Sequence, residues 1–305
     1  MIFNVDSINI DHVFSVARLP QAGETLRAEA YQVFLGGKGL NQSIALAKAL
    51  SGSQVEVCHI GAVGNDGGWV LDQISAFGLS VAHIQRLEDC ASGLASIYVD
   101  QAAENVIVLH GGANQALTLG HIKSALEPHK GKRAWVLFQN ETNLTVQSAK
   151  LARELGYRIA YTSAPFISEL TLEMLPLVDL ITVNETEAKQ LQDSLGHPLE
   201  KFKDLRILLT KGAQGALFMH QGKAIAQQAF RVKAVDTTGA GDTFFGSFMA
   251  CYAQSLAQQG ASEEQLILKA LRYAAGAAAL QVTKKGAAIA IPEHREVIEF
   301  LRDKP

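Results

Sequence analysis

Short apolar runs alternate with longer helical patterns along most of this chain, and no other feature limits its fold as strongly. The apolar runs that predict strands span 55–61, 134–139, 157–161, 180–183 and 207–209, and the helical patterns span 68–77 and 145–155. Strands that alternate with helices indicate an α/β fold, with a parallel sheet covered on both faces. Because ligands bind beyond the carboxyl ends of such strands, we expect the chemistry in the loops that follow them.

Two stretches do not follow this alternation. Residues 13–35, and the pair 94–99 and 105–109, have the pattern of β-ribbon, and the polar connection 100–104 predicts a hairpin within the pair. We expect a single α/β domain over residues 1–305, with a small β-sheet lid inserted at about 13–35 and 94–110. An extra antiparallel edge on the main sheet is the alternative interpretation.

Composition and charge exclude several classes of partner. Of the 305 residues, 48% are hydrophobic and 19% are charged, as in ordinary globular proteins. The formal net charge of -3 gives no basic field for nucleic acid or an anionic membrane. The N-terminus lacks a signal-peptide pattern, and no apolar run approaches the roughly 18 residues of a membrane helix. Three separated cysteines, an odd number, argue against a disulfide framework, so we expect a cytoplasmic protein.

The segment richest in chemistry is Asp236-Thr-Thr-Gly-Ala-Gly-Asp242, which leads into a helical pattern from Thr243 to about Gln258. The Gly239-Ala240-Gly241 run lets the backbone approach a ligand, and N–H groups at a helix start form an anion site. Beside a phosphate bound there, Asp242 could accept the proton of an attacking hydroxyl. A helix N-cap, which contributes about 1 kcal/mol, is the simpler explanation for this Asp alone. The full segment favours a site, and the helix dipole should keep Asp242 ionised at neutral pH.

A second glycine-rich segment, Gly36-Gly-Lys-Gly-Leu-Asn41, begins another helix. Its open backbone, together with Lys38 and Asn41, could meet sugar hydroxyls or negative charge, although a tight strand-to-helix turn would explain it equally well. The chain has no Walker A motif, and no GxGxxG follows a strand. Standard P-loop ATPases and nicotinamide dehydrogenases are therefore disfavoured.

Two shorter motifs also place polar groups at strand ends. Asn9-Ile-Asp11 lies near the end of the first strand, where a sugar diol is one partner for a buried carboxylate. A capped turn is the simpler explanation for this tripeptide alone. Asn184-Glu-Thr-Glu187 follows the strand 180–183 and begins a helix. Glutamate in a first turn suits the helix dipole, and Asn184 and Glu187 could instead meet a hydrated magnesium ion.

Taken together, these segments resemble the ribokinase, or PfkB, family of carbohydrate kinases over nearly the whole chain. DTTGAGD with the following Thr-Phe, and GGKGLNQ before a helix, are specific to that family, and Leu19–Thr25, Gly111–Asn114 and Val282–Gly286 are further similar pieces. The resemblance implies a ribokinase-like, Rossmann-type three-layer sandwich with a small β-sheet lid, through which family members commonly form homodimers. It implies ATP, Mg²⁺ and a monovalent cation, usually K⁺.

The resemblance also implies what the protein does. The expected activity is phosphorylation of a sugar by ATP, with the C5 hydroxyl of D-ribose as the first choice of acceptor. Deoxyribose, a ketohexose, or a nucleoside such as inosine or pseudouridine are the alternatives. A non-catalytic sugar- or nucleotide-binding regulator on the same fold is a further one.

Residue roles follow from the same resemblance. Asp242 would be the catalytic base, and Gly239, Ala240 and Gly241 would form the anion hole. The sugar pocket would be lined by Asn9, Asp11, Gly37, Lys38, Gly39, Asn41, Glu141 and Asp242. The nucleotide would be held by Asn184, Thr210, Lys211, Gly212, Gly215 and Gly241. Glu187 would organise Mg²⁺, through water, and the monovalent cation would be bound by Asp236, Thr238, Gln281, Lys284, Gly286 and Ala290, mostly through main-chain carbonyls.

The sequence departs from the family's pattern at a few positions near the implied site. Thr162-Ser163 stands where Asn-Pro is common, and Leu40 and Ile10 add bulk near the expected sugar pocket. Ala290 replaces a residue that is often Ser, and Ala275 stands where a polar residue often lies beside adenine. We expect these changes to affect the choice of sugar and the affinity for the cation more than kinase activity itself.

Overall fold

Nine strands form the main sheet of the computed structural model, which describes residues 1–102, 104–255 and 262–304. Their order across the sheet is β13-β12-β11-β10-β9-β8-β1-β4-β5. The strands are β1 (Ile2–Val5), β4 (Val57–Val63), β5 (Ile84–Arg86), β8 (Trp135–Phe138), β9 (Arg158–Thr162), β10 (Leu180–Asn184), β11 (Arg206–Thr210), β12 (Ala216–His220) and β13 (Lys223–Gln227). Pairing is parallel from β5 to β11, and β12 and β13 add an antiparallel edge. The predicted parallel sheet is confirmed.

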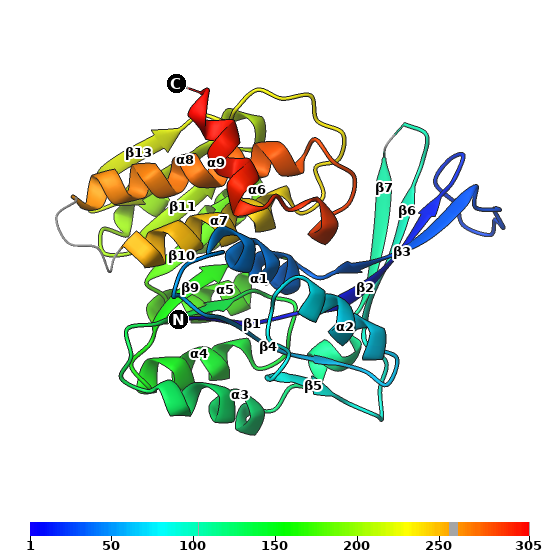
Figure 1. Ribbon diagram of the computed structural model, residues 1–305, viewed down its shortest axis with the longest axis horizontal. Coiled ribbons are helices and arrows are strands. Elements are labelled where there is room, and N and C mark those ends of the chain that lie inside the picture. The colour runs from blue at the N-terminus through cyan, green and yellow to red at the C-terminus, as the bar shows by residue number, and fades with distance from the viewer. Residues whose placement is uncertain (103, 256–261, 305) are drawn as a thin grey trace.

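Helices cover both faces of this sheet (Figure 1). One face carries α3 (Leu119–Leu126), α4 (Thr145–Glu154), α5 (Ser168–Met174) and α6 (Glu185–Leu195), and the other carries α1 (Lys38–Ala49), α7 (Ala240–Ser255), α8 (Glu263–Gln281) and α9 (His294–Arg302). Helix α2 (Gly68–Ala76) packs against α1 in a third apolar cluster. Short 3₁₀ turns lie at Gly112–Gln115, Glu127–His129, Leu175–Leu177, Leu199–Lys201, Gly212–Gln214 and Ala288–Ala290. The predicted three-layer α/β sandwich is therefore confirmed.

The core follows from alternation along the central strands. Phe3 and Val5 of β1 are buried on the face of α3 to α6, whereas Ile2 is buried on the face of α1 and α7. Strands that are apolar on both faces belong in the middle of a parallel sheet. The helix predicted from Thr243 begins earlier, at Ala240, and the last three residues of that prediction lie outside the described residues.

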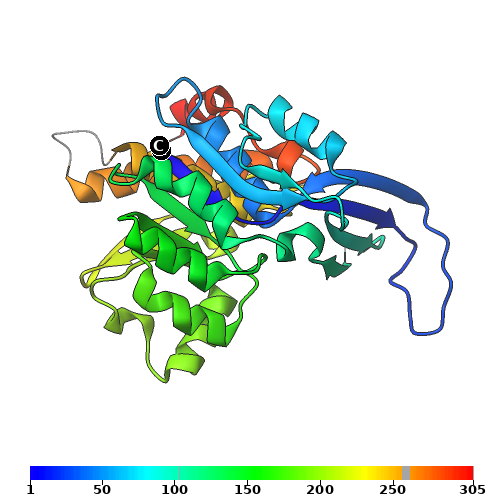
Figure 2. The ribbon, with the colours of Figure 1, turned by 90° about the horizontal axis from the view of Figure 1, so that it is seen from below.

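A second sheet of four strands projects from the body (Figures 1 and 2). Its order is β3-β2-β6-β7, and the strands are β2 (Asn9–Ser15), β3 (Ala30–Gly36), β6 (Gly93–Val99) and β7 (Asn105–His110). The alternative of an extra edge on the main sheet is therefore wrong. The second sheet also begins earlier than expected, because β1 ends at Val5. Asn9 and Asp11, which we expected near the end of the first strand, lie on β2 instead.

The carboxyl ends of neighbouring strands bring distant polar residues to one edge. Val5 of β1 is in register with Phe138 of β8, so Asp6-Ser7 and the segment that leads to Glu141 leave the sheet side by side. Asn184 ends β10 beside Thr210 at the end of β11. This edge is where ligands bind in parallel α/β sheets. Among the described helices, none is both long and apolar enough to cross a membrane.

Candidate active site

The N-terminal turn of α7 presents unpaired backbone donors. Gly239 precedes the helix with φ +75°, and a Cβ there would lie 3.0 Å from the Cβ of Ala287. Thr243 closes the first helical hydrogen bond to Gly239, so the amides of Gly241 and Asp242 have no hydrogen-bond partner in the described part of the chain. Two such amides at the positive end of a helix dipole favour a bound anion.

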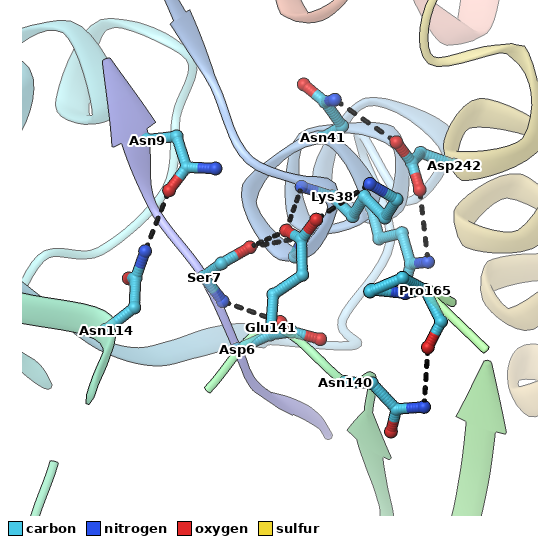
Figure 3. Close-up of polar contacts among 12 residues, drawn as sticks. Asp6, Ser7, Asn9, Lys38, Asn41, Asn114, Asn140, Glu141, Pro165 and Asp242 are labelled. Carbon is cyan, nitrogen blue, oxygen red and sulfur yellow. Dashed lines mark hydrogen bonds and ion pairs between the residues drawn. The ribbon is translucent and has the colours of Figure 1, made fainter. Parts of the chain in front are cut away.

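Asp242 lies in this turn and faces the start of α1 (Figure 3). Its carboxylate accepts hydrogen bonds from Asn41 Nδ2 at 3.2 Å and from Gln42 Nε2 at 3.4 Å. Burial raises the pKa of Asp242 to about 7, although the nearby Lys38 ammonium and the two amides oppose this shift. The expectation that the dipole keeps Asp242 fully ionised at neutral pH is therefore wrong. A pKa near the working pH suits a general base.

Glu141, Lys38 and Ser7 form one hydrogen-bonded cluster (Figure 3). Lys38 Nζ lies 2.7 Å from Glu141 Oε1, while Ser7 Oγ donates to Glu141 Oε2 at 2.6 Å and the Lys38 amide donates to it at 3.2 Å. Burial lowers the pKa of Lys38, but the surrounding carboxylates, Glu141 first, outweigh it and raise that pKa overall. The ammonium is therefore charged, and its charge lowers the pKa of Asp242.

Asp6, which the sequence analysis did not single out, lies beneath this cluster. Its side chain is fully buried, and Oδ1 accepts the Ser7 amide at 2.6 Å, whereas Oδ2 has no partner within the described ranges. Burial, and then the Glu141 charge, raise its pKa well above the usual range. A Cβ on Gly39 would clash with Asp6. Gly39 thus contributes to the site by letting its backbone pack on this buried acid.

Asp11 and Asn9 point from β2 toward the same edge. A Cβ on Gly36 would clash with the Asp11 carboxylate, which has no hydrogen-bond partner among residues 1–102, 104–255 and 262–304. Burial, and then the Glu141 charge, raise the pKa of Asp11 to about 7. A half-buried carboxylate without a partner suits a ligand that carries hydroxyl donors. Asn9 is bound by Asn114, whose Nδ2 donates to Asn9 Oδ1 at 2.7 Å.

The residues expected at the nucleotide follow β10 and β11. Asn184 and Thr210 are direct neighbours in the sheet, and the Lys211 amide donates to Gly215 O at 2.8 Å. Gly212 and Gly215 both have positive φ, +52° and +97°. A Cβ on Gly215 would clash with Gln227 O, so this turn requires glycine. Residues 211–215 thus form one turn after β11, and Asn184 lies beside Thr210 at the same carboxyl edge of the sheet.

Asn184 and Glu187 form a capping box at the start of α6. Asn184 Oδ1 accepts the Glu187 amide at 2.9 Å, and Glu187 Oε2 accepts the Asn184 amide at 2.8 Å. The structural explanation for this pair therefore holds. Burial raises the pKa of Glu187, and its Oε1 has no partner in the described chain. One remaining carboxylate oxygen fits a magnesium ion that keeps most of its waters.

The loop before α7 and the end of α8 converge on Gln281. Gln281 Nε2 donates to Thr238 O at 2.6 Å and to Gly286 O at 3.3 Å, while its Oε1 is buried without a partner among the described residues. Asp236 accepts the amides of Thr238 and Gly286, both at 2.9 Å. Carbonyl and carboxylate oxygens of this kind fit a hard monovalent cation. The Lys284 side chain instead binds Glu296 at 2.8 Å, and Ala290 lies in the separate turn Ala288–Ala290.

Two of the departures from the family's pattern lie away from the site. Leu40 is 0% exposed and Ile10 is 5% exposed, and both pack in the apolar cluster between α1, α2 and the root of the second sheet. The expectation that their bulk reshapes a sugar pocket is wrong, because both side chains point into the core. Thr162 ends β9 at the carboxyl edge, and Ser163, which follows it, is fully buried.

Known proteins resemble this chain over nearly its full length. A profile described as pfkB family carbohydrate kinase matches residues 1–294. The chain is 35% identical over 309 residues to a ribokinase of Haemophilus influenzae, with 97% of this chain and 96% of the relative covered. It is 31% identical over 314 residues to a deoxyribokinase of Salmonella typhi, with 97% of each covered. A structure of Arabidopsis thaliana ribokinase complexed with ribose and ATP matches with a TM-score of 0.81 at 27% identity, covering 99% of this chain and 98% of that one.

Proposed function

This chain belongs to the pfkB family of carbohydrate kinases, and from that membership we propose that it is a ribokinase that phosphorylates the C5 hydroxyl of D-ribose with ATP. The ribokinase of Haemophilus influenzae and the Arabidopsis ribokinase bound to ribose and ATP support this choice of substrates. The observation that carries the proposal is the position of Asp242. Its carboxylate accepts a hydrogen bond from Asn41 of α1, and it belongs to the same first turn as the Gly241 and Asp242 amides, which have no partner in the described part of the chain.

The proposed reaction uses the side chains at this edge. Asp11, Asn9 and Lys38 would bind sugar hydroxyls, and Asp242 would accept the proton of the attacking hydroxyl. A bond forms between that oxygen and the γ-phosphorus, while the bond from the γ-phosphorus to the β,γ-bridging oxygen breaks and ADP leaves. The amides of Gly241 and Asp242 would hold the negative charge of the transferring group.

The nucleotide would lie over the turns after β10 and β11, with Asn184, Thr210 and Lys211 through Gly215 along it. Glu187 would hold Mg²⁺ through water, and the ion would neutralise charge on the phosphates. K⁺ would be held next to the anion site by Asp236, Thr238, Gln281 and Gly286, and by the main chain at Lys284 and Ala290. Gln281 Oε1, which has no hydrogen-bond partner among the residues that the structure describes, supports this placement.

The second sheet has the features of a lid and of a dimer contact. Its outer strands expose a run of large apolar side chains, which are Tyr31, Val33, Val106, Ile107, Val108 and Leu109. Apolar clusters of this kind on edge strands mark association surfaces. We propose that residues 1–305 work as one kinase domain, that this sheet closes over the sugar, and that it pairs with a second copy. Because Cys58, Cys90 and Cys251 are all free, we also propose a reducing, cytoplasmic location.

Deoxyribose is the second candidate substrate, because a deoxyribokinase of Salmonella typhi is 31% identical to this chain. The two sugars differ by the 2-hydroxyl, so competition between them tests the proposal directly. We expect ribose to have the higher kcat/KM in assays with Mg·ATP and K⁺, because buried polar groups left without their hydroxyl partner disfavour the analogue. A higher kcat/KM for deoxyribose would overturn the assignment to ribose and leave kinase activity intact.

A further inference from the structure

Asn114 forms hydrogen bonds to residues 8 and 9, where the second sheet begins. It lies in the 3₁₀ turn Gly112–Gln115, is 2% exposed, and reaches across 106 positions to Ile8. Its Oδ1 accepts the Ile8 amide at 3.0 Å, and its Nδ2 donates to Ile8 O at 3.2 Å. The same Nδ2 donates to Asn9 Oδ1 at 2.7 Å. The backbone of Ile8 therefore fixes which end of the Asn114 amide is the donor.

The orientation of the Asn114 amide in turn fixes the orientation of the Asn9 amide. Because Asn9 Oδ1 accepts from Asn114, the Nδ2 of Asn9 points away from Asn114, toward the side where Lys38 and Asn41 lie (Figure 3). A flipped Asn9 would bring two NH₂ groups together. If the Asn114 amide were flipped, its NH₂ would face the Ile8 N–H and its oxygen would face the Ile8 carbonyl. Fixed backbone partners are what assign the orientation of side-chain amides.

Close packing holds the pair in this arrangement. A Cβ on Gly93, the first residue of β6, would clash with both Asn114 Nδ2 and Asn9 Oδ1. Gly93 is also the direct neighbour of Asn9 in the sheet. The two amides are therefore packed against a strand that has no side chain at this position, so neither side chain has room to move away, although an amide can still exchange its O and NH₂ in place.

We propose that Asn114 is a positioning residue for sugar recognition, which fixes Asn9 so that its Nδ2 donates to a hydroxyl of the sugar. This inference rests on the proposed function, since it takes the ligand beside Asn9 to be a sugar. The inference gives Asn9 and Asp11 different roles in the pocket. Ionised Asp11 can only accept hydrogen bonds from sugar hydroxyls, whereas Asn9 Nδ2 can only donate one to a hydroxyl oxygen. The two residues therefore require opposite hydrogen-bond directions at the hydroxyls that they contact.

Asn114→Asp tests this role with little change of shape. The introduced carboxylate still accepts the Ile8 amide but cannot donate, so Asn9 turns its own NH₂ toward that carboxylate and presents Oδ1 to the sugar. We expect the sugar KM to rise about tenfold or more, while the ATP KM and kcat change less than about threefold. The matched control is Asn143→Asp. The backbone amide of Asn143 donates to Asn114 O at 3.3 Å, but Asn143 does not touch Asn9, so its variant should keep the sugar KM within about twofold.

A double-mutant cycle separates positioning from a structural role. Asn9→Ala should raise the sugar KM by itself, and Asn114→Asp should add nothing further in that background. If Asn114→Asp raised the sugar KM equally in the wild-type and Asn9→Ala backgrounds, Asn114 would act through the start of β2 and not through Asn9. That result would overturn the inference. A neutron diffraction structure with bound sugar, which distinguishes nitrogen from oxygen, gives a readout independent of turnover: Asn9 Nδ2 on a sugar hydroxyl supports the inference, and Asn9 Oδ1 facing the sugar overturns it. A wild-type protein that binds and turns over no sugar would instead refute the proposed function.

Discussion

The side-chain amide of Asn41 donates a hydrogen bond of 3.2 Å to the carboxylate of Asp242, and so joins the first turns of two helices 201 positions apart. Asn41 belongs to the glycine-rich start of α1, and Asp242 belongs to the glycine-rich start of α7. The hydrogen bond therefore couples the two motifs that the sequence offers for sugar and phosphate. In the proposed reaction, it would hold the base where the sugar and the transferred phosphate meet.

Replacing the proposed base should separate activity from stability. Asp242→Asn keeps the shape and removes the proton acceptor, so we expect kcat to fall by about 10² to 10⁴.

In the folded protein Asp242 keeps its proton up to about pH 7, whereas the unfolded chain releases it near pH 4, so stability from this group is lost as pH rises between those values. The variant should therefore be more stable at pH 8, by roughly 1 to 3 kcal/mol. Calorimetric unfolding and ADP-release assays check both. An active variant would contradict the role of Asp242.

The same pKa predicts the acid side of the pH–rate profile. Only ionised Asp242 can accept a proton, so kcat/KM should rise with pH through about 7 and level off above about 8. The measurement is kcat/KM for the sugar between about pH 5 and 9 at constant ionic strength. A profile already level at pH 5 would show that Asp242 stays ionised in the working enzyme.

Two neighbours should move this acid limb in opposite directions. Glu141 raises the pKa of Asp242 and Lys38 lowers it, so Glu141→Gln should shift the limb to lower pH and Lys38→Met should shift it to higher pH. Both variants also lose the Lys38–Glu141 ion pair of 2.7 Å. If loss of that contact were the cause, the acid limbs of both variants would shift in the same direction. Parallel shifts of the two limbs would therefore argue against the electrostatic account.

Glycine at position 239 should be required for its conformation. Gly239→Ala meets a φ of +75° and a contact of 3.0 Å to Ala287, so we expect a loss of about 1 to 2 kcal/mol in stability and about tenfold or more in kcat. Gly241→Ala is the matched control, because a Cβ there meets nothing within 4 Å and the amide is kept. Its stability should stay within about 0.5 kcal/mol of wild type or rise. Equal losses of stability in both variants would mean that strain at 239 is not the cause.

The apolar edge of the second sheet predicts the oligomeric state. Ile107 is 50% exposed on β7, and Ile107→Lys should convert a dimer into a monomer in sedimentation equilibrium. Ile298, 42% exposed on α9, supplies the control, and Ile298→Lys should leave the dimer intact. A wild-type protein that is monomeric at tens of micromolar, or a dimeric Ile107→Lys variant, would place the contact elsewhere or remove it.

Sequence periodicity was sufficient to predict the layers of the fold and several of the strands and helices in them. Strand β10 and helix α2 were predicted nearly to the residue, because apolar runs and turn residues are local signals. The start of α7 was missed by three residues, because Gly239, Ala240 and Gly241 have low or mixed local preference and the fold decides where the helix begins. Asn9 and Asp11 were assigned to the wrong strand, since β1 is short and the break at Asp6–Ile8 contains neither Gly nor Pro.

The parts of the site that could not be predicted depend on contacts between distant segments. Asp6 has an ordinary sequence context, and only the fold buries it under Gly39 and beside Glu141. The raised pKa of Asp242 is likewise a consequence of burial, which competes with the helix dipole that the sequence does show. Leu40 and Ile10 were expected near the sugar because their neighbours in sequence lie there. Their own side chains point to the opposite side, into the core.

The measurement that tests the central claim most directly is sugar-dependent ADP release by the purified protein with Mg·ATP and K⁺ at pH 8, with the product identified by ³¹P NMR. We predict that D-ribose supports turnover, that the product carries its phosphate on C5, and that Asp242→Asn forms almost none of it. No ribose-dependent ADP release, or a phosphate on another carbon, would contradict this claim.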